Sequence, residues 1–188
     1  MNRRWVRRSL VALAVLALAP LQAGAQAPIK IGEINTYSGI AAPFTGPYRQ
    51  GVEMAVEEIN AKGGALGRKI EVVFRDDKGQ PAEAVKHAQE LVANEKVALM
   101  AGTFLSNVGL AVSDWAKQNK ALFVAAEPLT EALTWSKGHD HVFRVRPNTY
   151  EQGRMLAEKA AKLKPRGGPR SDRIMSTANG HGRRSATA

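Results

Sequence analysis

The sequence predicts an α/β fold of three layers, with a parallel β-sheet between two layers of helices. Short apolar runs alternate with amphipathic segments from residue 29 to residue 164, and polar breaks that contain glycine or proline separate them. Strands that alternate with helices of this length indicate a parallel sheet, and right-handed crossovers leave few possible strand orders. We expect the flavodoxin-like order 2-1-3-4-5, which is a common one for such sheets.

The first unit is a strand at Ile29–Asn35, followed by a loop at Thr36–Pro47 and a helix. We expect Pro47 in the first turn of that helix, because the fixed φ of proline suits a helix start. Gly63 and Gly64 end the helix. Its apolar positions follow the i, i+3, i+4, i+7 rule and are Val52, Ala55, Val56 and Ile59.

The second unit is a strand at Ile70–Phe74 and a helix that begins at Pro81, with a solvated turn predicted at Asp76–Gly79 between them. The third unit is a strand at Val97–Ala101, a polar turn at Gly102–Asn107 and an amphipathic helix. The predicted buried positions are Ala84, Val85, Ala88, Leu91 and Val92 on the second helix, and Leu110, Val112, Trp115 and Ala116 on the third.

The remaining elements complete the sheet. A fourth strand is predicted at Ala121–Ala126, followed by a polar loop at Glu127–Thr134 and a short fifth strand at Val142–Val145. A last helix is predicted at Thr149–Lys164. Its apolar positions are Met155, Leu156 and Ala160.

The predicted strand order also predicts where a ligand binds. In such a sheet the ligand lies beyond the carboxyl ends of the strands, where the winding reverses between the first and third strands. That rule selects the loops Ser38–Phe44, Thr103–Asn107 and Glu127–Thr130. The candidate ligand-binding residues are Phe44, Thr103, Ser106, Asn107, Glu127, Pro128, Leu129 and Thr130.

The middle loop carries hydroxyl and amide groups at the start of a helix. Thr103, Ser106 and Asn107, together with the free N–H groups of that helix end, suit a carboxylate or another polar group. The alternative is that Ser106 or Asn107 simply caps the helix, as such residues do in many proteins.

The outer two loops each allow two interpretations as well. Phe44 could cover the apolar part of a ligand from an exposed loop, or it could pack that loop onto the first helix. Glu127 and Thr130 could form hydrogen bonds with a ligand, although Thr130 could instead cap a short helix.

The sequence offers no candidate catalytic residues. It contains no P-loop, no G-x-G-x-x-G motif and no recognisable Ser-His-Asp set. The segment His139–His141 could supply two metal ligands, but nothing near it in the sequence supplies a third. Asp76 and Asp77 resemble an acidic receiver pocket only superficially, because they follow the second strand. We therefore expect neither an enzyme nor a cofactor or metal.

The first 25 residues predict a secretory signal peptide. Four arginines precede ten consecutive apolar residues, Leu10–Ala19, and the sequence Ala23-Gly24-Ala25 supplies a small-x-small cleavage pattern. Ten residues are too few to cross a membrane, which needs about twenty. We expect export to the periplasm, with no stable membrane insertion after cleavage.

The net charge of +10 is concentrated at the two ends of the chain. The four signal arginines account for +4, and residues 165–188 carry five arginines against one aspartate, so the body has about +2. A basic body would suggest nucleic-acid binding, and this body is not basic. The chain has no cysteine, which excludes disulfides and thiolate metal sites.

Several segments together resemble a known family. They are APIKIGEINTYSGIAAPFTGPYRQGVEMAVEEIN, KGGALGRKIEVVFRDDKGQPAEAVKHAQELV, GTFLSN and VFRVRPNTYEQG. They closely resemble the N-terminal half of type 1 periplasmic solute-binding proteins, in the branched-chain amino-acid (leucine/isoleucine/valine-binding) branch of ABC importers. The resemblance covers Pro28 to about Pro165.

The resemblance implies a fold of two lobes that close around a ligand. It implies a carboxylate site at Ser106, with Asn107 adjacent, and at the loop Glu127–Thr130, and it places the family's loop aromatic at Phe44. It also implies a small amino-acid-like solute, or a related amide or acid, and an inner-membrane ABC permease as partner. An extracytoplasmic ligand-sensing domain is the alternative, and an exported flavodoxin-like hydrolase is a weaker one.

The residues after Arg166 differ in character from the rest of the chain. They read GGPRSDRIMSTANGHGRRSATA, without apolar periodicity. A DNA sequence can be written that encodes residues 167–179. When one C is added before it, the new reading frame encodes RWATIGPNYEYGQ. This segment has the pattern of a strand followed by a polar loop, which the family resemblance would place there. Two of three bases in each shifted codon are fixed by the observed residues. We therefore expect a signal peptide at 1–25, an N-terminal lobe at 26–165, a disordered out-of-frame tail at 166–188, and a missing second lobe.

Sequencing the gene tests this frameshift. We expect that adding one base near the codon for Arg166 restores a long open reading frame, whose translation from that point begins with RWATIGPNYEYGQ. A gene whose undisturbed frame encodes residues 167–188 in independent isolates contradicts the prediction.

Overall fold

A computed structural model describes residues 26–163 of the chain. The predicted signal peptide and the predicted out-of-frame tail lie outside the described residues. The elements, in chain order, are β1 (Ile29–Asn35), η1 (Gly39–Ala41), α2 (Ala42–Ala61), β2 (Ile70–Asp76), α3 (Pro81–Ala93), β3 (Leu99–Gly102), α4 (Ser106–Asn119), β4 (Phe123–Ala125), η2 (Glu131–Leu133), β5 (Val142–Arg144) and α5 (Thr149–Leu163).

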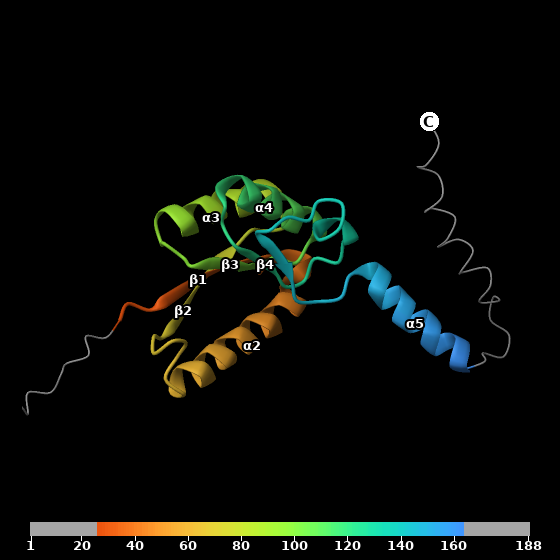
Figure 1. Cartoon of the computed structure of the whole chain (residues 1–188), viewed down its shortest axis with the longest axis horizontal. Coiled ribbons are helices and arrows are strands. Elements are labelled where there is room, and N and C mark those ends of the chain that lie inside the picture. The colour runs from red at the N-terminus through yellow and green to blue at the C-terminus, as the bar shows by residue number, and fades with distance from the viewer. Residues whose placement is uncertain (1–25, 164–188) are drawn as a thin grey trace, which may run out of the picture.

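The strands form one parallel sheet in the order β2-β1-β3-β4-β5, which confirms the predicted order. The register aligns Ile31 of β1 with Val72 of β2 and with Leu99 of β3. Helices α3 and α4 cover one face of the sheet, and α2 lies on the other (Figure 1). The carboxyl ends of β1 and β3 therefore meet at the point where the winding reverses, as the sequence predicted.

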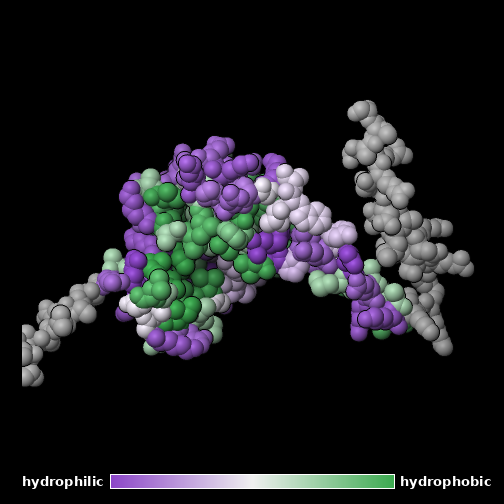
Figure 2. Space-filling model, viewed as in Figure 1, coloured by the Kyte–Doolittle hydropathy of each residue, from purple (hydrophilic) through white to green (hydrophobic). Residues whose placement is uncertain are grey.

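The apolar core lies between the sheet and the α3–α4 layer. Ile34, Met100 and Phe123 project from the strands and are fully buried. The helices meet them with five predicted residues, Ala84, Ala88, Leu91, Val112 and Ala116, and with Val108, which was not predicted; all six are buried. Hydrophilic residues cover the outer surface of this layer, and apolar residues gather between it and α2 (Figure 2).

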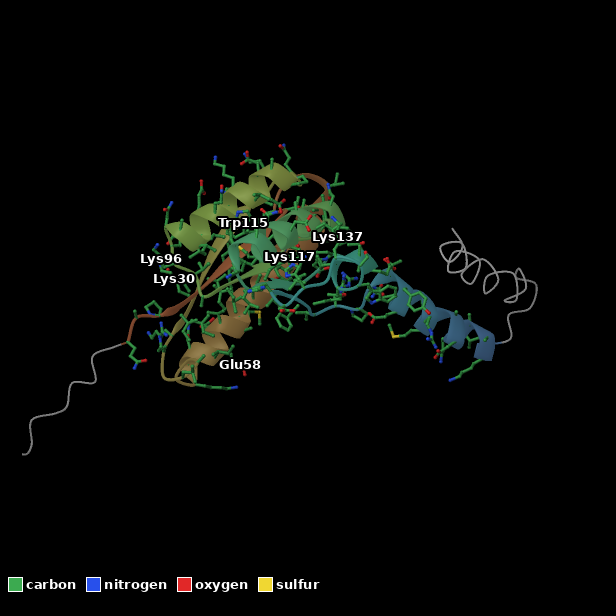
Figure 3. All side chains as sticks on the ribbon, turned by 45° about the horizontal axis from the view of Figure 1, so that its top comes forward. Lys30, Glu58, Lys96, Trp115, Lys117 and Lys137 are labelled. Atoms are coloured by element: carbon green, nitrogen blue, oxygen red, sulfur yellow. The ribbon has the colours of Figure 1, made fainter. Side chains whose placement is uncertain are left out.

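Several lysines and ion-pair partners lie on the periphery of the body (Figure 3), unlike Glu33 and Asp77, which are buried. Figure 3 shows Lys30 and Lys96 near one end of the sheet, with Lys117 and Lys137 on another part of the surface. The carboxylate of Glu95 pairs with Lys30 at 3.0 Å and with Arg75 at 3.4 Å. The lysines labelled in Figure 3 therefore lie on separate parts of the surface. Among residues 26–163 no helix is both long and apolar enough to span a bilayer.

The start of α2 corrects one prediction. The helix begins at Ala42 rather than near Pro47, so the second half of the predicted loop is helical and Pro47 lies inside the helix. Pro43 takes the starting position, where a missing N–H has no cost. The hydroxyl of Thr45 donates to the carbonyl of Thr36 at 2.7 Å, which ties the helix start to the end of β1.

The prediction of the buried face of α2 is only half right. Val52 and Val56 are partly buried, whereas Ala55 and Ile59 are exposed. Helix α5 forms as predicted, but it buries none of its side chains, so the expected apolar positions Met155 and Leu156 are exposed. Figure 1 shows α5 extending away from the sheet.

A buried polar cluster occupies the α2 side of β1. The carboxylate of Glu33 is buried and accepts hydrogen bonds from the hydroxyl of Tyr37 and, at 3.2 Å, from Nδ2 of Asn35. Burial raises the pKa of Glu33 to about 7, although the hydrogen bonds from Tyr37 and Asn35 oppose the shift. Burial also raises the pKa of the hydroxyls of Tyr37 and Tyr48.

Asp77 corrects the prediction of a solvated turn after β2. Its side chain is fully buried, and Oδ1 accepts from the hydroxyl of Thr36 at 2.6 Å and from the N–H of Gly79 at 2.7 Å. Its Oδ2 has no hydrogen-bond partner within the described part of the chain. Burial raises the pKa of Asp77. This aspartate therefore holds the end of β2 against the end of β1.

Gly102 ends β3 where no side chain fits. Its φ is +105°, and a Cβ added there would lie 2.4 Å from Oε1 of Glu33 and 2.4 Å from the carbonyl oxygen of Ile34. The next residue, Thr103, also has a left-handed backbone, with φ +60°, and donates its N–H to the carbonyl of Ile34 at 2.6 Å. This turn fixes the start of α4 against the end of β1.

We expect Gly102→Ala to destabilise the protein by about 2–4 kcal/mol, because it combines a disfavoured φ with two short contacts. Gly51→Ala is the matched control. Gly51 lies within α2, is exposed and has no atom outside its own helix near the position of a Cβ, so the alanine should stabilise the helix by up to about 1 kcal/mol. Urea unfolding followed by circular dichroism measures both. Equal stabilities for the two variants would contradict the role of Gly102.

We also expect stability to fall as the pH rises from about 4.5 to about 7. Over this range the folded protein keeps a proton on Glu33 that the unfolded chain has lost, so the unfolded state binds fewer protons. The loss should reach about 3 kcal/mol, and Asp77 adds to it with the same sign. Glu33→Gln should flatten most of this dependence in urea unfolding at about pH 5 and about pH 8.

Glu57→Gln is the control for that experiment, since Glu57 is an exposed glutamate on α2. This variant should keep the pH dependence of the unchanged protein. A Glu33→Gln variant with the full pH dependence would show that Glu33 ionises normally in the folded state.

Candidate functional site

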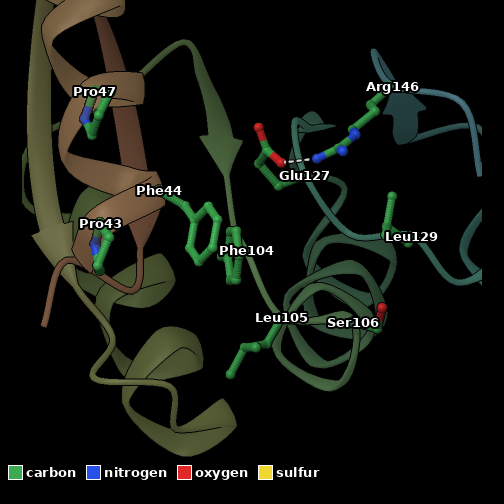
Figure 4. Close-up of a pocket in the computed structure, with 9 residues that line it drawn as sticks. All are labelled: Pro43, Phe44, Pro47, Phe104, Leu105, Ser106, Glu127, Leu129 and Arg146. Carbon is green, nitrogen blue, oxygen red and sulfur yellow. Dashed lines mark hydrogen bonds and ion pairs between the residues drawn. The ribbon is translucent and has the colours of Figure 1, made fainter. Parts of the chain in front are cut away.

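A cleft lies at the carboxyl edge of the sheet, where the sequence predicted a ligand site. Its volume is about 640 Å³, within the range of pockets that hold one small molecule. The first turn of α2, the turn between β3 and α4, the loop after β4 and the segment after β5 surround it (Figure 4). The lining residues are Pro43, Phe44, Pro47, Phe104, Leu105, Ser106, Glu127, Leu129 and Arg146.

Two stacked phenylalanines form one wall of the cleft. The ring centroids of Phe44 and Phe104 are 5.8 Å apart and their planes differ by 20°. Phe44 projects from the first turn of α2 rather than from a loop, and it is 64% exposed. The interpretation in which Phe44 packs a loop onto the first helix is wrong, because Phe44 belongs to that helix and its ring packs on Phe104. Its exposed surface lines the cleft, and contact with a ligand stays a prediction.

Ser106 contributes a hydroxyl at the first residue of α4. The helix is capped by Leu105 without a side-chain hydrogen bond, so the alternative in which Ser106 or Asn107 caps it is wrong. The Ser106 Oγ accepts from the N–H of Thr130 at 3.3 Å, which leaves its own proton free to donate. The first N–H groups of a helix also have no partner within the helix. This end of the cleft therefore presents hydrogen-bond donors.

An ion pair lies across the cleft from the phenylalanines (Figure 4). Nη1 of Arg146 donates to Oε2 of Glu127, and the side chains are 44% and 23% exposed, respectively. Arg144 anchors the same loop, because its guanidinium donates to the carbonyls of Pro128 and Thr130. The loop after β4 is thus held by two arginines from the β5 segment.

Four of the eight predicted site residues line the cleft, namely Phe44, Ser106, Glu127 and Leu129. The other four predicted residues do not line the cleft. Five lining residues were not among the predicted site residues, namely Pro43, Pro47, Phe104, Leu105 and Arg146, although Pro43, Phe104 and Leu105 lie in the loops that the strand order selected. Arg146 could have been found, because it follows a strand whose carboxyl end lies at the same edge of the sheet.

Four predicted ligand-binding residues lie outside the cleft, and three of them are buried or hold the local backbone. Thr103 is fully buried and its hydroxyl has no hydrogen-bond partner among the described residues. Pro128 is buried against α4, where a Cβ at Gly109 would lie only 2.6 Å from its Cγ. Asn107 is exposed beside the cleft. Thr130 caps η2 by accepting from the N–H of Ala132 at 3.3 Å, which confirms the capping interpretation.

The histidine segment forms a structural contact. Nε2 of His139 lies 2.9 Å from Oγ and 3.0 Å from the carbonyl oxygen of Ser113, while Nδ1 accepts from the N–H of His141. A histidine that accepts at Nδ1 carries its proton at Nε2, so in this arrangement it cannot activate the Ser113 hydroxyl as a base. Within residues 26–163 no three histidine, cysteine or acidic side chains gather as metal ligands would.

Comparison with known proteins gives consistent matches. The family described as periplasmic binding protein matches residues 28–174. A Leu/Ile/Val-binding protein homologue from Brucella suis is 34% identical over 157 residues, which is 84% of this chain and 39% of that protein.

Solved structures agree with the sequence comparison. A branched-chain amino-acid transporter substrate-binding protein from Streptococcus pneumoniae, in complex with isoleucine, has a TM-score of 0.64 at 31% identity, covering 71% of this chain and 38% of that one. An ABC-transporter solute-binding protein from Rhodopseudomonas palustris, in complex with 4-hydroxybenzoate, has a TM-score of 0.64 at 28% identity, covering 73% and 36%.

The chain spans about two fifths of the length of these relatives. The matched part of the chain includes the parallel sheet and its flanking helices. The chain therefore belongs to the periplasmic binding protein family, a family of solute-binding proteins rather than enzymes.

Proposed function

We propose that this chain is the N-terminal part of the extracytoplasmic solute-binding component of an ABC importer. The observation that supports this is the cleft at the winding reversal of the sheet, which combines an apolar wall with hydrogen-bond donors. The proposed solute is a branched-chain amino acid or a related small amide or carboxylate. The relative from Streptococcus pneumoniae is described with isoleucine and the relative from Rhodopseudomonas palustris with 4-hydroxybenzoate, and both ligands join a carboxylate to an apolar body.

The donors at the start of α4 would hold the carboxylate. The Ser106 hydroxyl has a free proton, and the N-terminal end of α4 carries the positive end of the helix dipole. The apolar part of the solute would lie against Phe44 and Phe104. Six of the nine lining residues are apolar, which suits a solute with one polar end and one apolar end.

The described cleft is open to solvent, since Phe44 is 64% exposed and Arg146 is 44% exposed, so we propose that this chain binds its solute weakly. In a trap of two lobes, affinity depends on closure, which buries most of the ligand and excludes water. A single lobe leaves the ligand open to solvent. Binding by the 188-residue chain should therefore be weaker than micromolar.

The proposed partner is an inner-membrane permease, and the proposed location is the periplasm. This part of the proposal rests on the arginine-rich, apolar N-terminal segment read as a signal peptide and on the family to which the chain belongs. After cleavage of that segment we expect no stable membrane insertion.

We expect Ser106→Ala to weaken the binding of a carboxylate solute by about 1–3 kcal/mol, because one donor to a charged group is lost. Ligand-observed NMR titration with a panel of amino acids and small acids measures this at the affinities expected here. Ser136→Ala is the matched control, because Ser136 is an exposed serine outside the cleft. Unchanged affinity in Ser106→Ala would remove Ser106 from the proposed site.

A further inference from the structure

The cleft has two polar ends separated by an apolar wall. One end is formed by Ser106 at the start of α4, and the other by the Glu127–Arg146 ion pair; Figure 4 shows the two at different heights along the cleft. The Phe44–Phe104 stack faces the space between them. A solute that extends along this wall meets hydrogen-bonding groups at both ends.

The ion pair can accept and donate at the same time. Arg146 uses Nη1 for Glu127 and keeps other N–H groups of its guanidinium free, while Glu127 keeps Oε1 free. Both side chains remain partly open to the cleft. A hydroxyl group fits this pair well, because it can donate to the carboxylate and accept from the guanidinium.

Contact with an aliphatic side chain would be unfavourable for the same ion pair. An amino acid carries its ammonium and carboxylate on one carbon, so with its carboxylate near Ser106 its side chain would point along the wall. A leucine or isoleucine side chain placed against Glu127 and Arg146 would remove water from two charges without replacing their hydrogen bonds. The far end of the cleft therefore favours a second polar group.

We propose that Glu127 and Arg146 are specificity-determining residues, and that they select a ring-bearing carboxylate with a hydroxyl at the opposite end of the ring. The ring lies against the stacked phenylalanines, where it can stack on, or meet edge-on, the part of the pair that the two rings do not cover on each other. The carboxylate lies at Ser106, and the hydroxyl lies at the ion pair. This inference rests on the proposed solute-binding function and narrows its ligand class.

The test compares two probes of the same shape, 4-hydroxybenzoate and 4-methylbenzoate, with isoleucine as a third probe. Ligand-observed NMR titrations use the full chain. We expect the hydroxyl compound to bind about tenfold more tightly than the methyl compound, as hydrogen bonds to charged groups allow. Arg146→Gln and Glu127→Gln should each reduce that ratio to about one.

Arg154→Gln is the matched control. Arg154 also pairs with a glutamate, Glu158, but on the exposed helix α5 away from the cleft, so this variant should keep the tenfold ratio. Thermal unfolding of each variant verifies that it is folded. Having two variants, one on each side of the ion pair, keeps the test decisive if one of them is unstable.

Three results overturn the inference, and they separate it from the proposed function. Equal binding of the hydroxyl and methyl probes contradicts the role of the ion pair. Tighter binding of isoleucine than of both benzoates, unchanged in Arg146→Gln, contradicts the ligand class and leaves the solute-binding function intact. Binding of no probe and of no member of the amino-acid panel contradicts the proposed function, and the inference falls with it.

Discussion

The close approach of Gly102 to the end of β1 is the contact on which the carboxyl edge of the sheet depends. The N–H of Thr103 reaches the carbonyl of Ile34, and the N–H of Ala126 reaches the carbonyl of Gly102 at 2.9 Å. The two bonds join β1, β3 and the end of β4 at one point. Because α4 begins three residues after Thr103, the position of Ser106 follows from this turn. A side chain at residue 102 would separate the strands at the place where the cleft forms.

The two faces of the sheet are held in different ways. Toward α3 and α4 the contacts are apolar and tightly packed, with Ile34, Met100 and Phe123 at their centre. Toward α2 the burial is less complete and includes polar groups, since Glu33 is hydrogen-bonded in the interior, Val52 and Val56 are only partly buried, and α2 buries only Thr45 completely. The guanidinium of Arg49 on α2 also lies 4.4 Å from the ring centroid of Phe74. The side that carries Phe44 is therefore the side whose stability depends on protonation.

Most of the fold could be predicted from the sequence, because it depends on local patterns. The apolar spacing of Ala84, Ala88 and Leu91 predicted α3 and its buried face, and strand–helix alternation predicted the strand order. The start of α2 was predicted wrongly because two prolines, Pro43 and Pro47, both suit a helix start, and the sequence does not show which one takes it.

The site could be predicted only in part, because its geometry depends on contacts between distant residues. Asp77 looks like a turn residue, and its burial follows from a hydrogen bond to Thr36, forty-one positions earlier. Arg146 reaches the cleft because β5 pairs with β4, which brings it to Glu127. Thr103 was expected at the surface of the turn, and its left-handed backbone places its side chain inside instead.

Helix α5 is attached to the body only near its first turn, and this has a mechanical consequence. Tyr150 packs edge-on against Trp135 with ring centroids 5.4 Å apart, and its N–H bonds to Oε1 of Glu131 at 2.8 Å. From that attachment the fifteen-residue helix runs for about 22 Å. A rotation of about 10° at the attachment would displace Leu163 by about 4 Å, by the geometry of a rigid rod of that length. The pivot of such a rotation, at the hydrogen bonds to Glu131 and Leu129, would lie beside the cleft, which Leu129 lines.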